Sequence, residues 1–583
     1  MKSMSERSES KISDIDVLVI GGGIAAVFAA IKAKEAGAQT VVMVDKGYTG
    51  TSGMTPFAAG FLFAYFPGED DLDDQFRSMV RGLGWLAQQD VVMDHFERVY
   101  GIMQDMEDYG VEFEKTEDGK WKRTAGRGKV PGMHFAGPKL MEVMAKALRK
   151  KGIQQVHRTM VTDLLTRDGE VHGAVGFDVR TGEFRVFEAK ATVLATGGCW
   201  YKGRCPGQRD VTGDGVMITF RAGATLAGPE WGDPANLFPA HFDIGPGMSV
   251  YAGEGGIMLN GKGERFMESY NPKLMERSGL RLVGAAFCIE VRRGSGPIYM
   301  DMRHFTPEQM ERIRWILPLA VKMYERAGLL VNNRFVQPIE WVPAAPIARV
   351  GLVVDRNHAT NLPGYFACGE AVSRQARIEG ITACATSGAI AGESAAAYAQ
   401  KEISIINFSG NDLKELEAYA LGMMKRKDGI EPDQVILAIE ETLFPYDVLY
   451  LRHEERMQKA LDRIYDIRDN EVSQLCAYDP HYLKTAHEAR NMTLVAELHL
   501  KAAMMRKETR TILREDYPYE DNENWLKWID IHNRNGKAEL NTRDVPIDDY
   551  PLKPERGKRL YYMWQRAQEN GAVKIEGGKA IWV

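Results

Sequence analysis

The sequence predicts an α/β fold that contains a Rossmann-like nucleotide-binding unit, and three consecutive segments near the N-terminus support this prediction. Asp16–Ile20 is a short apolar run with the β-branched character of a buried parallel strand. The alanine-rich stretch that ends at Gly37 is typical of a helix, and Gln39–Val44 has the character of a second strand. Together they form a complete β-α-β unit that is closed by Asp45.

The turn between the first strand and the helix has the spacing of a dinucleotide-binding loop. The pattern G-x-G-x-x-A is formed by Gly21, Gly23, Ile24, Ala25 and Ala26. Because the glycines lack side chains, their backbone N–H groups can approach a pyrophosphate at a helix N-terminus. Asp45 follows at about the 20-residue spacing from which a carboxylate accepts a hydrogen bond from a ribose 2′-hydroxyl. We therefore expect a bound dinucleotide, and a purely structural glycine turn is the alternative.

Three later segments indicate which dinucleotide is bound. Ala191–Gly198 is another buried strand that ends in a glycine turn, and it contains Thr196 and Gly197. Thr212–Gly215 opens a helix, and Gly364–Glu370 is a strand that ends in a Gly-Glu pair. A site assembled from segments so far apart suits an extended FAD better than a transiently docked NAD.

Composition argues against several other classes of protein. The formal net charge of −6 over 583 residues argues against nucleic acid as a partner, because phosphate binding requires a basic surface. No two of the six cysteines are separated by two residues, so zinc-ribbon and ferredoxin-type spacings are absent and no bound metal is expected. The polar segment Met1–Lys11 has no signal-peptide core, and there is no apolar run of about 18 residues. We expect a cytoplasmic protein in a reducing compartment, without a membrane span.

The same segments, with four further runs, follow the order found in one enzyme family. The further runs are Gly253-Glu-Gly-Gly256, Gly263-Glu-Arg-Phe-Met267, Arg514-Glu-Asp-Tyr-Pro518 and Asn524-Trp525. With them, the sequence resembles the FAD-dependent family of succinate dehydrogenase and fumarate reductase flavoprotein subunits. That family also includes L-aspartate oxidase and the adenylylsulfate reductase α subunit.

The resemblance implies a discontinuous Rossmann-like FAD-binding domain, formed by residues 12–235 and 346–402. A capping domain, residues 236–345, is inserted between the two halves. Residues 413–525 form a helical domain after a linker at 407–412, with a helix break at Asp479-Pro480. Residues 526–583 are assigned only as a C-terminal extension.

The resemblance also implies a set of FAD-binding residues. Glu370 resembles the glutamate that hydrogen-bonds the ribityl chain, and Asp214 matches an aspartate of the FAD domain. The full set is Gly21, Gly23, Ile24, Ala25, Ala26, Asp45, Lys46, Ser52, Gly53, Met54, Thr55, Thr196, Gly197, Asp214, Glu370, Thr382 and Ala383. Covalent-flavin members carry a histidine in a Ser-His-Thr segment, and the matching stretch here is Ser52-Gly-Met-Thr55. We therefore expect noncovalent FAD.

Three residues are candidates for catalysis. Arg377, in Arg377-Ile-Glu-Gly380, resembles the family's substrate-binding arginine, and the planar guanidinium fork matches a carboxylate. Arg281 falls near the family's proton-donating arginine, although Arg277 competes for that register. His241, like His134, could act as a general base, but a structural or surface histidine is the favoured interpretation of each.

Other segments depart from the succinate and fumarate enzymes. Their Thr-Glu-Gly-x-Arg run is replaced by Met248–Ala252, and their Gln-Phe-His-Pro-Thr segment is matched only by Trp231–Asn236. Arg349 lies where their pocket histidine is expected. Most of the dicarboxylate pocket is therefore missing, which disfavours succinate or fumarate as the substrate. Between Cys199 and Cys205 a redox disulfide is conceivable, but two ordinary thiols are favoured.

These observations favour a flavoprotein subunit that transfers a hydride between a small anionic substrate and FAD. The chain has neither cluster-binding cysteines nor a second Rossmann fingerprint, so we expect electron exchange with an iron–sulfur partner. Three alternatives remain open: an enzyme like adenylylsulfate reductase, which the histidine-free turn at residues 52–60 and the segment 508–528 resemble, a self-contained flavin oxidase, and an FAD-binding subunit without catalysis of its own.

Overall fold

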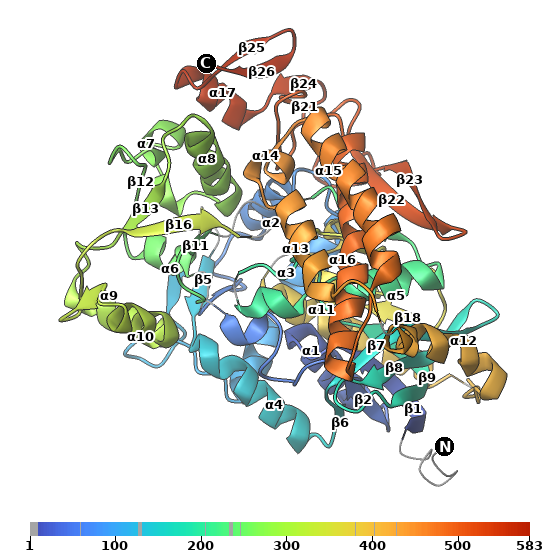
Figure 1. The fold of residues 1–583 in the computed structure, drawn as a ribbon. Helices are drawn as coiled ribbons and strands as arrows, with labels where there is room; N and C mark the ends of the chain where they lie inside the picture. The colour runs from blue at the N-terminus through green and yellow to red at the C-terminus, as the bar shows by residue number, and fades with distance from the viewer. Residues whose placement is uncertain are drawn as a thin grey trace.

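The computed structural model describes residues 10–58, 60–125, 131–204, 206–231, 237–244, 247–344, 346–378, 380–401, 403–426 and 428–583. Its central sheet confirms the predicted α/β class (Figure 1). The strands β6 (Gln154–Val156), β2 (Val41–Val44), β1 (Lys11–Ile20) and β9 (Phe184–Leu194) are hydrogen-bonded in that order, and all these pairs are parallel. Parallel β18 (Tyr365–Ala367) pairs with the end of β9.

An antiparallel pair extends this sheet beyond β9. The strand β8 (Glu170–Asp178) pairs with β9, and β7 (Thr159–Arg167) pairs with β8. The strands β1, β2, β9 and β18 end on the same side of the sheet because they are parallel. Their C-terminal ends form the edge at which open α/β sheets bind ligands.

Two helices of small residues pack closely against each other beside the sheet. The crossover helix α1 (Ile24–Glu35) and α11 (Ile381–Ala399) make extensive contact. A Cβ on Gly388 or Gly392 would fall within 3.0 Å of backbone atoms of Ala25 or Ala29. Glycine and alanine therefore bring these two helices together, and the start of α11 reaches the loop that follows β1.

The inserted segment has its own sheet and its own hydrophobic core. The antiparallel strands β11 (Leu237–Pro239), β16 (Ile339–Pro343), β13 (Ile298–Asp301) and β12 (Ile257–Leu259) are paired in that order. The helices α8 (Leu280–Arg292), α9 (Pro307–Ile316) and α10 (Pro318–Arg326) cover them around the buried Trp341. In Figure 1 this segment is the green and yellow-green body that stands beside the central sheet.

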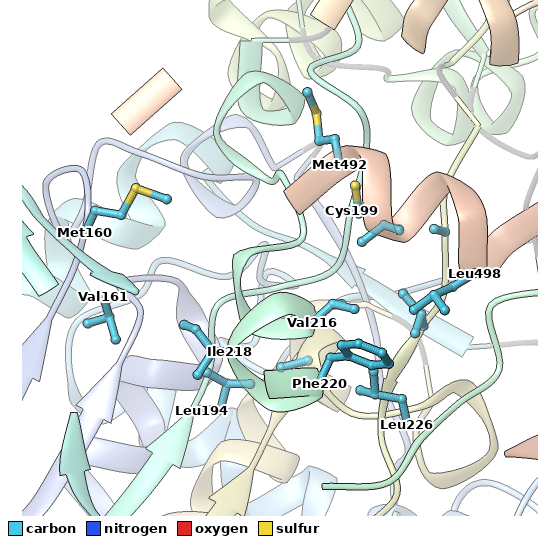
Figure 2. Packing of buried hydrophobic residues seen from close by; sticks show 14 of the residues in the cluster. Met160, Val161, Leu194, Cys199, Val216, Ile218, Phe220, Leu226, Met492 and Leu498 are labelled. Carbon is cyan, nitrogen blue, oxygen red and sulfur yellow. The ribbon is translucent and has the colours of Figure 1, made fainter. Parts of the chain in front are cut away.

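The helical segment does not have a separate core. It contains α12 (Gly410–Leu421), α13 (Pro432–Leu443), α15 (Glu454–Asp466) and α16 (Pro480–Met505). The apolar stripe that α16 presents is fully buried: Ala486, Ala489, Met492, Ala496, Leu500 and Ala503. Met492 and Leu498 of this helix pack in one cluster with residues of the sheet and of α5 (Asp214–Ala222), as Figure 2 shows.

The ends of two helices refine the sequence expectations. The helix α16 begins where the break was expected, because Pro480 has no backbone N–H to lose and the Asp479 carboxylate accepts from the Tyr482 N–H at 2.8 Å. The expected linker at 407–412 is shorter than the sequence indicated, since α12 starts at Gly410. Ser409 and Asp412 form a capping box there, so the polar residues that suggested a linker begin a helix.

The C-terminal extension is built into the rest of the fold. Its hairpin β22 (Lys527–Arg534) and β23 (Lys537–Asp544) extends a sheet with β10 (Leu226–Ala227) and β17 (Gly351–Leu352). The helix α17 (Tyr562–Glu569) then packs Trp564 into the core of the inserted segment. In Figure 1 α17 and the last strands of the chain lie at the top of the molecule, and the hairpin of β22 and β23 lies at its right-hand side.

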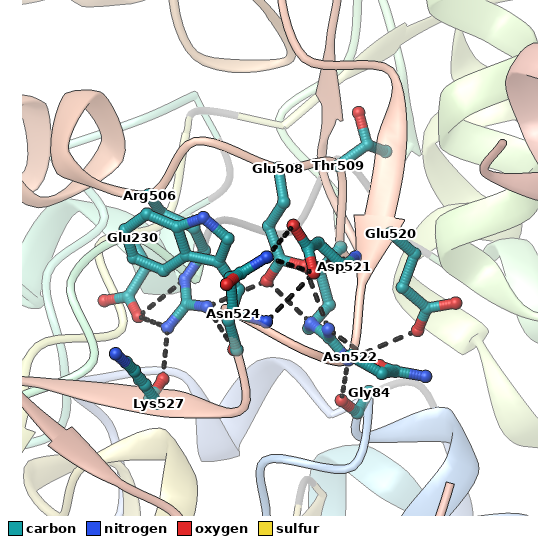
Figure 3. A network of polar contacts seen from close by, with 12 residues as sticks. Gly84, Glu230, Arg506, Glu508, Thr509, Glu520, Asp521, Asn522, Asn524 and Lys527 are labelled. Carbon is teal, nitrogen blue, oxygen red and sulfur yellow. Dashed lines mark hydrogen bonds and ion pairs between the residues drawn. The ribbon is translucent and has the colours of Figure 1, made fainter. Parts of the chain in front are cut away.

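A buried polar network joins residues 506–510, which follow α16, to Glu230 and Gly84 (Figure 3). Arg506 contacts Glu230 and Glu508 at 2.9 Å each, and Arg510 contacts Glu508 at 2.7 Å. Arg510 also donates to the Gly84 carbonyl oxygen at 2.8 Å. Because removal of one partner leaves an uncompensated buried charge, networks of this kind hold their elements in one arrangement.

Within the described residues, none of the helices is both long enough and apolar enough to cross a lipid bilayer.

The packing of the extension leads to a stability prediction. Ile531 of β22 is fully buried in the cluster that contains the central sheet, whereas Thr542 of β23 is exposed on the same hairpin. Ile531→Ala should lower the free energy of unfolding by about 2 to 5 kcal/mol, because it leaves a cavity in the shared core. Thr542→Ala should change it by less than about 0.5 kcal/mol. Urea unfolding of the apoprotein measures both, and equally small effects would contradict a shared core.

Candidate flavin site

A cavity of about 940 Å³ lies at the C-terminal ends of β1, β2 and β9, at the upper end of the usual size range of ligand sites. Most of the predicted cofactor residues line it: Gly21, Gly23, Ile24, Ala25, Asp45, Lys46, Ser52, Gly53, Met54, Thr55, Thr196, Gly197, Asp214 and Glu370. Three others lie behind the lining. Ala26 is buried inside α1, the Thr382 hydroxyl donates to the Phe63 carbonyl oxygen at 2.9 Å, and Ala383 packs in a neighbouring apolar cluster.

The glycine turn after β1 fits a phosphate group. Gly21 has a φ of +131°, and a Cβ there would fall within 3.0 Å of the Ala195 carbonyl oxygen. A Cβ on Gly22 would collide in the same way with the Asp45 carboxylate. The helix α1 has no side-chain N-cap and no acidic residue in its first turn. Its N-terminal N–H groups and dipole are therefore suited to a diphosphate.

Asp45 lies at the end of β2, next to this turn. Its carboxylate accepts from the Gly47 N–H at 3.1 Å and from the Ser52 hydroxyl at 3.4 Å. Burial raises the pKa of Asp45, although the Gly47 N–H and the Lys46 ammonium oppose the rise. The carboxylate retains acceptor capacity for a ribose hydroxyl, which is the role that the sequence predicts.

Lys46 joins the FAD-domain loops to the helical segment. Its Nζ lies 2.7 Å from both Asp214 Oδ2 and Glu488 Oε1, and it donates to the Thr212 hydroxyl at 2.8 Å. Burial alone would lower the pKa of Lys46, but the two carboxylates outweigh it and the pKa is raised. Lys46 is therefore a fixed cation in the wall of the cavity.

Buried arginines lie beside Glu370, which lines the cavity, but they are not themselves among its lining residues. Glu370 Oε1 accepts from Arg349 Nη1 at 3.0 Å and lies 4.0 Å from Arg377 Nη1, and Oε2 accepts from the Trp200 indole N–H at 3.4 Å. Arg377 and Arg374 are both buried; Arg377 Nε donates to the Val372 carbonyl oxygen, and Arg374 donates to the Arg377 carbonyl oxygen, at 3.0 Å each. Sequence reasoning missed Arg374, and its closeness to Arg377 in the chain was the available signal.

The other two catalytic candidates lie away from this cavity. His241 is 72% exposed, and its Nε2 lies 3.1 Å from Glu340 Oε2 on the inserted segment. Arg281 donates to the Gly82 carbonyl oxygen at the end of α2 (Leu72–Gly82). Among the described residues that line the flavin cavity, neither His241 nor Arg281 is found, and their catalytic roles stay predictions.

Arg277, the competing arginine, does line a cavity. This second cavity, of about 210 Å³, lies between the inserted segment and the strands β3 (Phe61–Phe63) and β5 (Pro131–His134). His134 and Ser249 share its wall. Burial lowers the pKa of His134, which favours a neutral ring.

Two expectations concern residues that the structure describes only in part. Trp231 is buried, and the rest of the segment that ends at Asn236 lies outside the described residues. Cys199 is a buried free thiol, and burial raises its pKa to about 12. Cys205 lies outside the described residues, so the pair is not tested.

The glycine turn, the acid after β2 and the cavity between them define a dinucleotide-dependent enzyme of the FAD class. Comparison with known proteins identifies the family. Residues 16–382 match the model of an FAD-binding domain, and residues 443–561 match the C-terminal region of fumarate reductase flavoproteins. The chain belongs to the family of FAD-dependent succinate dehydrogenase and fumarate reductase flavoprotein subunits. It is an FAD-dependent oxidoreductase, and FAD is its cofactor.

Individual relatives agree with this assignment. An uncharacterized FAD-dependent oxidoreductase of Methanocaldococcus jannaschii is 31% identical over 88% of this chain and 95% of its own length. The solved structure of the Escherichia coli quinol fumarate reductase flavoprotein has a TM-score of 0.81 at 26% identity, covering 94% of this chain and 99% of that one. Adenylylsulfate reductase of Archaeoglobus fulgidus has a TM-score of 0.77 at 22% identity, covering 93% of this chain and 97% of that one, which shows a shared fold.

The environment of Asp45 predicts that FAD affinity depends on pH. In the predicted role of Asp45, a ribose hydroxyl would donate to its ionised carboxylate, so protonation of Asp45 would compete with FAD. Since burial raises the pKa of Asp45 above its usual 3.8, affinity should fall as the pH drops through that raised value, by up to about tenfold per pH unit below it. Fluorescence titration of the apoprotein with FAD between about pH 4 and pH 8 measures this dependence.

Asp45→Asn is the control for this titration. It should bind FAD more weakly at neutral pH and should lose most of the acid dependence, while Lys46 and His157, whose charges act on Asp45, remain in place. An unchanged pH dependence in Asp45→Asn would assign the titration to another group.

Proposed function

We propose that this protein transfers a hydride between a small anionic substrate and FAD, as the flavoprotein subunit of an electron-transfer complex. The observation that supports this most strongly is a group of buried arginines beside Glu370, a residue of the cavity wall. Arg349 and Arg377 lie 3.0 Å and 4.0 Å from Glu370 Oε1, and Arg374 contacts Arg377. A buried guanidinium is always charged and presents fixed donors, so it binds and orients a carboxylate or another oxyanion.

The surroundings of these arginines suit a water-poor site. The guanidinium of Arg349 lies 5.8 Å from the Trp200 ring centre, and that of Arg374 lies 5.9 Å from the Trp231 ring centre. Both indoles are buried, so they restrict water around the arginines and strengthen each charge–charge contact. Bound FAD supplies the two-electron chemistry. The task of the arginines is to hold an anion in one orientation beside it.

The substrate is proposed to differ from succinate and fumarate. Met248–Gly253 form the short helix α6, with Ser249 and Ala252 where the family's acid and arginine are expected. Ser249 and Ala252 line the cavity that also contains Arg277 and His134, and their short side chains leave it open. A pocket that lacks those charged groups does not present the family's full set of partners for two carboxylates, so we propose a small anion of another shape.

Electrons are proposed to leave or enter through an iron–sulfur protein. Six cysteines without cluster spacing argue against a cluster carried by this chain. Within the described ranges, the structure places no three His, Cys, Asp or Glu side chains where they could hold a metal ion. The free thiols of Cys199, Cys288 and Cys368 agree with a reducing, cytoplasmic setting, and Gly53 and Met54 in the cavity wall agree with noncovalent FAD.

Anaerobic reduction of the flavin by candidate anions tests the proposal. Arg377→Gln should slow flavin reduction by a substrate about 10- to 100-fold, because it removes a charged hydrogen-bond donor from the anion. Arg303→Gln is the matched control, since Arg303 is exposed and pairs only with Asp301 in the described structure. FAD content is measured in each variant, so that loss of cofactor is separated from loss of substrate binding.

The same measurement separates the alternatives. A flavin that no candidate anion reduces, in a protein that retains FAD, would support a noncatalytic subunit. Rapid reoxidation by air with stoichiometric peroxide would support the self-contained oxidase. If a candidate anion reduces the flavin of Arg377→Gln as fast as that of the unchanged protein, the proposed anion site is contradicted.

A further inference from the structure

The helical segment contributes part of the wall of the flavin cavity. Asp479, Pro480, His481 and Lys484, in and just before the first turns of α16, line the same cavity as the glycine turn. We propose that this end of α16 is a component of the FAD site, and that Lys484 binds the adenosine diphosphate half of the cofactor. This inference rests on FAD binding and extends the site beyond the FAD-binding domain.

The order of the strands in the sheet indicates where the two halves of FAD lie in the cavity. Asp45 follows β2 and Glu370 follows β18, and these strands lie on opposite sides of β1 and β9. The glycine turn lies between them, so a diphosphate there separates a ribose at Asp45 from a flavin at Glu370.

The loop before β7 adjoins the Asp45 side of the cavity. Thr159 N–H donates to the Asp45 carbonyl oxygen at 2.9 Å, and Arg158 N–H donates to the Gly47 carbonyl oxygen at 2.8 Å. Pro480 of α16 packs against Gly182, in the turn between β8 and β9, where an added Cβ would lie 3.2 Å from the proline ring. The first turn of α16 therefore packs against the strand group that borders the Asp45 side of the cavity.

Where α16 meets the cavity, three lysines share two carboxylates. The fully buried Glu488 carboxylate contacts Lys46 at 2.7 Å, Lys202 at 2.8 Å and Lys484 at 3.1 Å. Lys46 also has Asp214. Among the described residues, Lys484 has Glu488 as its only ion-pair partner and shares it with two other lysines. A third anion in the cavity would complete this arrangement, and the diphosphate of FAD carries that charge.

The protonation of Lys484 agrees with this interpretation. Burial lowers the pKa of Lys484, Glu488 opposes the change, and Lys202 and Lys46 add to it. The ammonium is therefore destabilised until a further negative charge comes close. An approaching phosphate would raise the pKa of Lys484 and recover the lost stabilisation.

The helix cannot easily move away from this position. Asn491 donates to Asp214 Oδ1 at 2.8 Å, and Glu488 links α16 to Lys46. Both bonds connect buried groups of α16 to the loops of the flavin cavity. Displacement of α16 would leave these charges without partners, so the helix closes this end of the cavity as a fixed wall.

The proposal is tested with Lys484→Met, and Lys501→Met is the matched control. Lys501 lies on the same helix and pairs with Glu497 at 3.2 Å, four residues away, but it does not line the cavity. Lys484→Met should weaken FAD binding about tenfold or more and speed its release, whereas Lys501→Met should stay within about twofold of the unchanged protein. The dissociation constant is measured by fluorescence titration of the apoprotein.

A second readout distinguishes direct binding from a weakened helix. The proposal expects that Lys484→Met lowers the affinity for ADP, leaves the affinity for riboflavin unchanged and is rescued in part by Lys484→Arg. Equal losses for ADP and riboflavin, or an FAD affinity equal to that of Lys501→Met, would overturn it. Failure of the unchanged protein to bind FAD would instead contradict the cofactor assignment itself, so the two failures are distinguishable.

Discussion

The close approach of backbone at the end of β1 is the constraint on which the flavin site depends. Gly21 packs against the carbonyl oxygen of Ala195 at the end of β9, and Gly22 packs against the carboxylate of Asp45 at the end of β2. A side chain at Gly21 would collide with backbone, and a side chain at Gly22 would displace the Asp45 carboxylate. The two glycines therefore bring three strand ends together around the N-terminus of α1, and the cavity opens where they meet.

Later segments of the chain form the rest of the cavity wall. Glu370, which follows β18, lies beside Arg349 and Arg377, and Glu488 of α16 contacts Lys46. The C-terminal hairpin then joins the sheet that contains β10 and β17. The cofactor site, the inserted segment and the C-terminal segments thus share buried contacts, which explains how residues more than 400 positions apart line one cavity.

Local sequence pattern predicted the parts of this structure that depend on local physics. The β-α-β unit, the apolar stripe of α16 and the start of that helix at Asp479-Pro480 follow from apolar periodicity, glycine spacing and capping chemistry. The strand β1 is longer than expected because Lys11 and Ile12 pair with β9, and their polar neighbours hid that pairing. The packing of the helical segment against the central sheet could not be predicted, because an apolar stripe does not determine which surface covers it.

The residues of the site also differ in how far local sequence predicts them. Glycines, Asp45 and Glu370 could be predicted because a motif fixes their place relative to a strand end. Lys484 was not predicted, because its place in the cavity wall depends on how α16 packs against the rest of the fold. Arg374 was missed although it lies three residues before Arg377, whose carbonyl oxygen it contacts. His241 was predicted from the usual pKa of histidine and its position near the expected site, and Arg281 was predicted from its register. Neither observation determines whether a side chain faces a cavity or the surface.

The central claim is that one cavity, walled by the glycine turn, Asp45, Glu370 and the first turns of α16, holds an extended noncovalent FAD. A crystal structure of the protein with FAD bound tests it most directly. We expect density for the diphosphate between the N-terminus of α1 and Lys484, for the adenosine ribose beside Asp45 and for the flavin ring beside Glu370, with no bond to the chain. Density for FAD in another place, in the reverse orientation, or continuous with a side chain would contradict it.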